Sequence, residues 1–193
     1  MSTSPLTSSQ TVGPFFSPAL LRKDAVRNVL TQPETAGESI RIEGRILDGD
    51  GLPIPDAMIE IWQANAHGRY NHPADTGSAA LDPSFLGFGG SGTDEDGRYW
   101  FETVKPGPVP FDGKRWQAPH ICVTIFARGI LNHLVTRLYF ADEPANTLDP
   151  VLNAVPRDRQ ATLFATPEQG EALVTYRFDI VLQGANETVF FNV

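Results

Sequence analysis

The chain has 193 residues, the length of one domain and enough to bury a core without disulfides or a structural metal. Its formal net charge is −8, and no basic stripe runs through its 15 lysines and arginines, so we expect no binding to nucleic acid, whose phosphates require clustered cations. A single cysteine, no apolar run near the ~18 residues that span a membrane and no signal pattern in the first ten residues together predict a soluble cytoplasmic protein with no membrane partner.

The first 38 residues differ from the rest and are expected to form an N-terminal arm. Thr11 to Phe16 is a turn with two adjacent phenylalanines, and Ser17-Pro18 predicts the start of a short helix that runs through Leu30. Two phenylalanines in a polar arm should be buried, either on this chain's own core or on a neighbouring subunit. We expect residues 1–38 to pack on a partner subunit and residues 39–193 to form the folded domain.

From residue 39 the sequence alternates apolar and polar residues in short runs, separated by turns rich in glycine and aspartate. Seven or so strands of this kind predict an all-β fold, an antiparallel β-sandwich with an irregular N-terminal arm and long loops. A short helix is also expected near Asp149. The expected strands cover residues 40–46, 57–64, 98–104, 120–127, 134–140, 174–183 and 188–191.

The long connection from Asn65 to Thr93 has little periodicity, and loops of this length inside compact domains are usually functional or disordered. Its glycine-rich end, Gly87 to Gly92, lacks the strand–motif–helix context of a nucleotide-binding loop and is interpreted as a flexible or tightly packed loop. The acidic turns at 48–51 and 94–97 lack the spacing of a calcium-binding EF-hand loop and are interpreted as hairpin turns.

The segment from Trp116 to Cys122 carries the clearest sign of chemistry. In an extended strand, residues two apart point to the same face, so His120 and Cys122 should project side by side. Such a pair suits zinc, but no recognisable spacing supplies further ligands. A cysteine–histidine hydrolase would lack the third group that orients its base. The other histidines that could complete a metal site are His67, His72 and His133.

A series of short motifs then runs from about Gln10 to the C-terminus. The motifs are Ser9 to Phe15, Ile59 to Asn65, Gly68-Arg69-Tyr70, Leu81-Asp82-Pro83, Thr93 to Gly97, Lys105 to Pro108, Ala118 to Ile121, Phe126 to Gly129 and Thr136 to Phe140. In order and spacing this series resembles the intradiol ring-cleavage dioxygenases. The fold of that family is a β-sandwich, which agrees with the strand count.

The resemblance also implies which residues stand at the metal-binding positions. In that family the catalytic chain holds non-haem Fe(III) with two tyrosines and two histidines, and hard Fe(III) favours anionic oxygen donors. Tyr70 and His120 match the first tyrosine and the first histidine. Val109 and Cys122 stand where the second of each belongs, and Gln117 replaces an active-site arginine. Valine cannot coordinate a metal and a thiolate beside Fe(III) is prone to redox chemistry, so no intact metal site is expected in this chain.

The resemblance therefore implies an accessory alpha subunit, with no catalytic residues of its own, that packs beside a catalytic beta chain in alpha–beta units of a larger oligomer. The beta chain would bind the Fe(III) and cleave a small aromatic substrate, 3,4-dihydroxybenzoate, with O2 to 3-carboxy-cis,cis-muconate, in the beta-ketoadipate pathway of aromatic catabolism. The resemblance further implies that Gly13, Pro14 and Arg128 help to line the beta chain's pocket, where a planar guanidinium can grip the substrate carboxylate.

Two alternatives of other classes stay open at the level of sequence. In one, the chain is a self-sufficient metal-dependent dioxygenase that binds iron or zinc at a rearranged site of Tyr70, His120 and Cys122. In the other, the chain is a β-sandwich binding module without catalytic activity. Iron content and association with a catalytic chain distinguish the three hypotheses.

Overall fold

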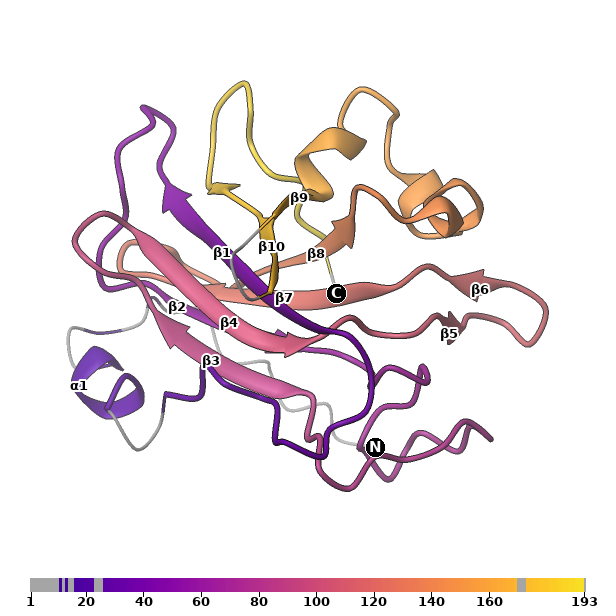
Figure 1. The fold of residues 1–193 in the computed structure, drawn as a ribbon. Coiled ribbons are helices and arrows are strands. Elements are labelled where there is room, and N and C mark those ends of the chain that lie inside the picture. Colours follow the sequence, from indigo (N-terminus) through magenta and orange to yellow (C-terminus); the bar gives the residue numbers. More distant parts are fainter. Residues whose placement is uncertain (1–10, 12, 14–15, 23–25, 170–172, 193) are drawn as a thin grey trace, which may run out of the picture.

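A computed structural model of the chain (Figure 1) describes residues 11, 13, 16–22, 26–169 and 173–192. Strands make up most of its regular structure, and the predicted all-β fold is confirmed. Within the described residues, no helix is long and apolar enough to cross a membrane. The elements are α1 (Phe16–Leu20), β1 (Ser39–Leu47), β2 (Met58–Trp62), β3 (Phe88–Gly92), β4 (Arg98–Val104), β5 (Val109–Pro110), β6 (Trp116–Gln117), β7 (His120–Phe126), β8 (Leu134–Phe140), the 3-10 helices η1 (Pro144–Leu148), η2 (Leu152–Ala154) and η3 (Gln160–Leu163), β9 (Phe164–Gln169), β10 (Val174–Arg177) and β11 (Ile180–Val181).

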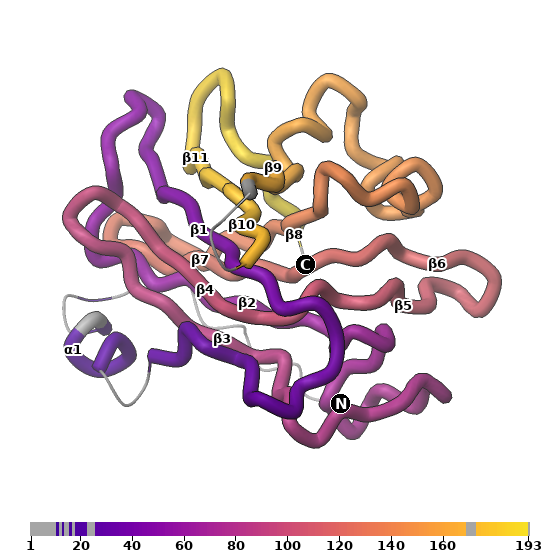
Figure 2. Tube along the Cα trace, in the orientation of Figure 1, coloured from indigo at the N-terminus to yellow at the C-terminus, as the bar shows by residue number. Residues whose placement is uncertain are grey.

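The main sheet is continuous and curves around a common core. Its strand order is β11-β1-β10-β9-β8-β7-β2-β3, with β4 paired to the other edge of β1, and β5 and β6 form a separate small ribbon. Most pairs are antiparallel, as predicted, but β1 runs parallel to β10 and β11, and β8 runs parallel to β9. The violet β1 and the yellow β10 in Figure 2 lie side by side although they are far apart in the sequence. No hairpin joins β1 directly to β10, so nothing requires this pair to be antiparallel, and the sheet contains both parallel and antiparallel pairs.

A large hydrophobic core lies inside this curved sheet. In β1, isoleucines alternate with polar residues, so Ile40, Ile42 and Ile46 are buried while their neighbours face outward. Fully burying one such side chain contributes about 1.5–3 kcal/mol. The same cluster contains Ile59 of β2, Phe101 of β4, Val123 of β7, Leu138 of β8 and Tyr176 of β10. The alternation that predicted these strands is therefore the pattern that builds the core.

β3 is a strand that the sequence did not predict, because it consists mostly of glycine. The missing side chains let an N-terminal segment lie directly on it: a Cβ on Gly89 would stand 2.8 Å from Leu30 Cδ1. Arg27 and Gly90 exchange backbone hydrogen bonds of 2.9 and 3.1 Å. Residues 26–30 of the expected arm therefore pack on this chain's own sheet.

Two further expectations about local structure are wrong. The helix expected through Leu30 is confined to α1, because residues 26–30 are extended and bond to β3 and β4. No strand is found in the described residues 188–192; Thr188 instead closes a turn, its N–H donating to the Val181 carbonyl at 2.9 Å and its hydroxyl accepting from the Val181 N–H at 3.0 Å. The short helix expected near Asp149 corresponds to η1 and η2 on either side of it, and β9 was not predicted.

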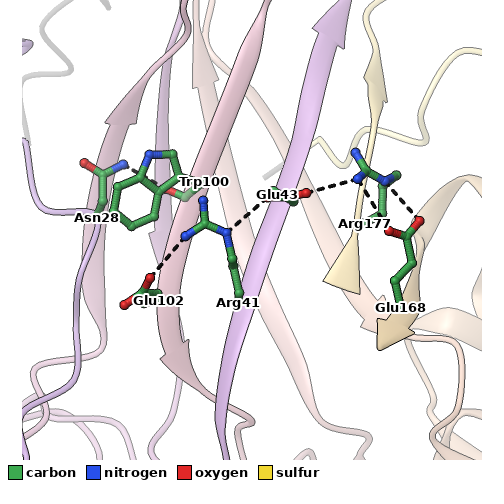
Figure 3. Close-up of polar contacts among 7 residues, drawn as sticks. All are labelled: Asn28, Arg41, Glu43, Trp100, Glu102, Glu168 and Arg177. Atoms are coloured by element: carbon green, nitrogen blue, oxygen red, sulfur yellow. Dashed lines mark hydrogen bonds and ion pairs between the residues drawn. The ribbon is translucent and has the colours of Figure 1, made fainter. Parts of the chain in front are cut away.

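The outward face of β4, β1, β10 and β9 carries a ladder of alternating charge (Figure 3). Its members in order are Glu102, Arg41, Glu43, Arg177 and Glu168, with nitrogen–oxygen distances of 3.0 or 3.1 Å between neighbours. The Arg41 guanidinium also lies 4.6 Å from the centre of the Trp100 ring. Partly exposed pairs contribute roughly 0.2–1 kcal/mol each. The ladder therefore adds little stability, but it disfavours shifts of register that would place like charges opposite one another.

Candidate functional site

Strands β2, β7 and β8 place three side chains in a row on one face of the sheet. Trp62 lies opposite Cys122 in the β2–β7 pair, and Cys122 lies opposite Arg137 in the β7–β8 pair. Ile121 and Val123, the neighbours of Cys122 on β7, point into the core, so alternation places Cys122 on the opposite face. His120 precedes Cys122 by two residues and shares its face. The strand thus brings the histidine and the cysteine together as the sequence predicted.

His120 is almost wholly buried, with 3% of its surface exposed. Its Nδ1 lies 2.7 Å from the backbone oxygen of Ala118. A carbonyl oxygen only accepts, so Nδ1 carries the hydrogen and Nε2 keeps its lone pair. Burial, together with a smaller effect of the positive charge of Arg137, lowers the pKa of the imidazole to about 4. His120 is therefore neutral at pH 7.

A buried carboxylate, that of Asp149, holds the backbone beside His120. Its Oδ2 accepts a hydrogen bond of 2.7 Å from the N–H of Ala118. Its Oδ1 accepts from two N–H groups at the start of η2, at 2.8 and 2.7 Å, and from the hydroxyl of Tyr139 at 3.2 Å. Asp149 therefore ties η2 and β8 to the residue whose carbonyl orients the imidazole.

Tyr70 reaches this region from the loop that follows β2. The loop turns at Asn65, whose side-chain oxygen accepts a hydrogen bond of 3.0 Å from the N–H of Arg69. The Tyr70 ring stacks on Trp62, with 5.8 Å between ring centres and 18° between ring planes. Burial raises the pKa of the Tyr70 hydroxyl and that of the Cys122 thiol above their ordinary values. In the metal-free chain both groups are therefore protonated at neutral pH.

The small β5–β6 ribbon adds two more of the predicted positions. Val109 and Gln117 lie opposite each other in its register, and Val109 is buried. The Oε1 of Gln117 accepts a hydrogen bond of 2.7 Å from Nη1 of Arg137. Gln117, predicted to replace an active-site arginine, thus binds an arginine that comes from β8.

Arg137 is the residue at this site that sequence reasoning missed. Its guanidinium also donates to the hydroxyl of Tyr139 at 3.4 Å. Within the described part of the chain no carboxylate forms an ion pair with it, and its nearest charged or titrating neighbours are hydroxyl and thiol groups. The sequence held part of the signal, because strand alternation places Arg137 on the opposite face from Thr136 and Leu138. That this face is the one on which β7 presents Cys122 is seen only from the β7–β8 register.

The remaining histidines do not join this group. His67, His72 and His133 are exposed. The His72 ring meets the edge of Trp62 at 6.4 Å, and the His133 ring packs on Phe126 at 5.7 Å. Among the residues that the structure describes, no group of three or more histidine, cysteine, aspartate or glutamate residues could hold a metal ion. These histidines therefore do not complete a zinc site.

A second candidate region lies just beyond β7, where the chain turns. The N–H of Ile130 donates to the carbonyl of Ala127 at 3.4 Å, and Gly129 adopts a φ of +87°, which favours glycine. Arg128 stands on this turn with 60% of its side chain exposed and forms an ion pair with Asp56. The turn therefore presents a guanidinium outward.

The start of the described chain lies against the same turn. The N–H of Gly129 donates to the hydroxyl of Thr11 at 3.2 Å, although the two residues are 118 positions apart. Gly13 is exposed, and no atom lies within 4 Å of a Cβ placed on it. Pro14, also predicted to be at this site, lies outside the described residues. The structure thus brings Thr11, two positions before Gly13, to the turn that carries Arg128.

Similarity to known proteins extends over nearly the whole chain. A family model described as Dioxygenase matches residues 11–184. The chain belongs to the intradiol ring-cleavage dioxygenase family. It is 44% identical over 204 residues to the protocatechuate 3,4-dioxygenase alpha chain of Burkholderia cepacia, covering 100% of both chains. It is 40% identical to the beta chain from the same organism, covering 95% of this chain and 78% of that one.

A solved structure supports the same fold for this intradiol-family chain. The dioxygenase domain of a carbohydrate-binding fusion protein from Streptomyces sp. SirexAA-E superimposes with a TM-score of 0.61 at 26% identity. The match covers 94% of this chain and 100% of that domain. The chain is thus a member of an oxidoreductase family, and all of its sequence is matched by a relative named as the alpha chain of such an enzyme.

Intradiol dioxygenases use non-haem Fe(III), and the donor set of this family member does not fit that ion. Val109 offers no donor atom, and Cys122 offers a soft sulfur, whereas hard Fe(III) favours anionic oxygen donors. Of the four positions, His120 presents a neutral lone pair and Tyr70 a phenol. The guanidinium of Arg137 adds positive charge where a cation would need negative charge. The ligand positions in this chain therefore lack the donors that the family's iron requires.

Proposed function

We propose that the chain is the non-iron alpha subunit of a protocatechuate 3,4-dioxygenase. A separate catalytic beta chain holds the Fe(III) and cleaves 3,4-dihydroxybenzoate with O2 to 3-carboxy-cis,cis-muconate, a step of the beta-ketoadipate pathway. The observation that carries this proposal is the donor set. Val109 and Cys122 stand at two of the ligand positions in a chain that keeps the family fold and full-length similarity. A subunit that packs beside a catalytic chain needs the family fold but does not need the iron-binding side chains.

Identity alone does not distinguish an alpha from a beta assignment, since the values are 44% and 40%. The donor set favours alpha, because a catalytic chain needs the ligands that this chain is proposed to lack. It therefore supports an accessory subunit.

The proposed contribution of this chain to the partner's pocket is the edge at Arg128. An exposed planar guanidinium can bind a carboxylate through two parallel hydrogen bonds, and 3,4-dihydroxybenzoate carries one carboxylate. The ion pair with Asp56 is exposed and contributes roughly 0.2–1 kcal/mol, so a substrate carboxylate can compete for the same guanidinium. Gly13 and Pro14 are proposed to form the adjoining wall, because Thr11 is bonded to the same turn.

The proposed packing of the arm on the partner concerns mainly its first residues. Residues 26–30 lie on this chain's own β3 and β4, which leaves the segment before α1 to reach a neighbour. Thr11 of that segment is bonded to the Arg128 turn, where the proposed pocket edge lies. The interface and the pocket edge are therefore proposed to be continuous.

Iron measurement tests the proposal directly. The full chain is produced alone and together with a beta chain, and bound iron and ring cleavage are measured in each preparation. The isolated chain should hold little iron and show no turnover, whereas the complex should hold iron and be active. Stoichiometric iron and turnover in the isolated chain would contradict the proposal and support the self-sufficient alternative, in which Cys122→Ser abolishes both. If the chain elutes as a monomer in size-exclusion chromatography even when the beta chain is present, the result would support the alternative that it is a binding module without catalytic activity.

A further inference from the structure

We propose that the guanidinium of Arg137 stands in the place of a metal ion among the altered ligand positions and excludes metal from this chain as a fixed positive charge. This inference deepens the proposed function, because it rests on the iron being held by another chain. It also makes a separate claim: the loss of donors at Val109 and Cys122 is not the whole barrier to metal binding.

Two strand registers fix the position of the guanidinium. Arg137 lies opposite Cys122 in the antiparallel β7–β8 pair, so their Cβ atoms are about 5 Å apart on one face of the sheet. From there Nη1 reaches to 2.7 Å from Gln117 Oε1, and Gln117 is the register partner of Val109. The guanidinium therefore extends from one altered position toward the other, across the region on which ligands would converge.

The same guanidinium also lies on the face that carries His120. His120 lies opposite Tyr139 in the β7–β8 pair, as Cys122 lies opposite Arg137, and residues two apart on a strand share a face. The Tyr139 hydroxyl accepts a hydrogen bond of 3.4 Å from Arg137. The face that presents His120 and Cys122 therefore already holds a cation that belongs to the protein itself.

Neutral acceptors hold this cation in place. Gln117 accepts one hydrogen bond, and the hydroxyl of Tyr139 accepts a second while donating its own hydrogen to Asp149. In the described part of the chain, no carboxylate pairs directly with Arg137. A partly buried cation usually lies beside an anion. Arg137 instead lies among a thiol, a phenol and an imidazole, the groups that a metal ion would otherwise attract.

A fixed cation at this place opposes a metal ion by direct repulsion. At a separation of roughly 4–6 Å, a unit charge weakens the binding of a divalent or trivalent ion by more than about a hundredfold, even with the screening typical near a protein surface. Restoring the missing donors while Arg137 remains should therefore fail to create a metal site.

The test compares full-length variants that differ in this charge. Val109→Tyr with Cys122→His restores the family's donor types, and Arg137→Gln is added to a second variant because glutamine keeps an amide donor for Gln117 and Tyr139. The matched control adds Arg177→Gln, an equal change of charge on β10, in the surface ladder. After incubation with iron and gel filtration, only the variant with Arg137→Gln should retain iron, on the order of a hundredfold more than the other two. It should also show the visible absorption of an Fe(III)–phenolate.

Two outcomes would overturn the proposal. One is equal iron retention with and without Arg137→Gln. The other is no retention in any variant although circular dichroism shows all of them folded. Because Val109 is buried and a larger side chain there can prevent folding, a simpler pair of variants covers that case. Arg137→Gln alone should bind Zn²⁺ through His120 and Cys122 about a hundredfold more tightly than the wild type or Arg177→Gln, and equal affinities would contradict the proposal.

The two proposals fail in different ways. If the wild-type chain itself binds stoichiometric iron, the proposed function is wrong. If the wild-type chain binds none and Arg137→Gln changes nothing, the proposed function stands and only the role of Arg137 is lost.

Discussion

Two arginines mark the two candidate regions of this chain, and their surroundings differ in almost every physical respect. Arg137 is partly buried between β7 and the β5–β6 ribbon, and Gln117 and Tyr139 hold its guanidinium. Arg128 stands on the turn after β7 with most of its side chain in solvent, paired at the surface with Asp56. The same side chain is thus enclosed in one region and presented outward in the other.

This difference separates an inner role from an outer role. An enclosed charge acts strongly on the groups of its own chain, because little water screens it, and Arg137 shifts the titration of His120 and Cys122. An exposed charge is screened and held weakly, so it remains available to a molecule or chain that approaches. The inner region therefore resembles a former ligand site, and the outer edge is the region suited to binding.

The largest expected effect concerns the inner region. Asp149→Ala leaves the N–H groups of Ala118 and η2, and the hydroxyl of Tyr139, without their acceptor in a buried place. We expect the free energy of unfolding to fall by about 3–5 kcal/mol in urea titrations. Arg128→Ala, on the outer edge, should change it by less than about 0.5 kcal/mol. Similar losses in the two variants would remove the distinction between the regions.

The second effect in size should be a loss of stability at acidic pH, caused by His120 in the inner region. Burial lowers the pKa of His120 from its ordinary 6.5 to about 4, so between these values the unfolded chain takes up a proton that the folded chain does not. The contribution of His120 to the free energy of unfolding does not change with pH above 6.5. As the pH falls from 6.5 to 4, the free energy of unfolding decreases by about 3 kcal/mol. Urea titrations across this range should show a smaller loss for His120→Gln than for wild type. The exposed His133→Gln serves as the control, and parallel curves for wild type and His120→Gln would contradict the prediction.

The outer edge should show its effect in binding rather than in stability. In the complex with a beta chain, Arg128→Ala should raise KM for 3,4-dihydroxybenzoate on the order of 10- to 100-fold, the value of a charge-assisted hydrogen bond. KM for catechol, which has no carboxylate, should change little. Steady-state kinetics with both substrates provides the comparison. Equal increases for both would show that Arg128 does not hold the carboxylate.

The smallest expected effect is that of the cysteine. Cys122→Ser should leave kcat and the iron content of the complex within about twofold of wild type, because the proposed iron site belongs to the beta chain and Cys122 has no part in it. Serine also keeps a similar volume beside Trp62 and Arg137. A large loss of iron or activity would place Cys122 in the chemistry and favour the self-sufficient alternative.

The sequence predicted most of the strands because their pattern is local. Ile40, Ile42 and Ile46 alternate with polar residues, and that alternation is sufficient to predict β1. The glycines of β3 carry no such pattern, since their pairing depends on the distant Leu30 and Arg27 that pack against them. The parallel pairing of β1 with β10 likewise depends on contacts between the ends of the sequence.

At the candidate site, too, local sequence patterns predicted some features, whereas others depend on contacts between distant residues. The adjacency of His120 and Cys122 follows from strand geometry alone, and the structure contains it. The position of Arg137 beside them depends on the register of β7 and β8, and its bond to Gln117 depends on a ribbon of two short strands. Short-range patterns cannot give such registers, so the residue that completes the inner region was found only in three dimensions.

The central claim is that the iron of this enzyme belongs to another chain. The most direct test is the metal stoichiometry of a purified complex of this chain with a beta chain, determined by elemental analysis against the measured amount of each chain. We predict one iron for each alpha–beta pair, and a purified alpha chain without iron. Two irons per pair, or iron that remains with the separated alpha chain, would contradict it.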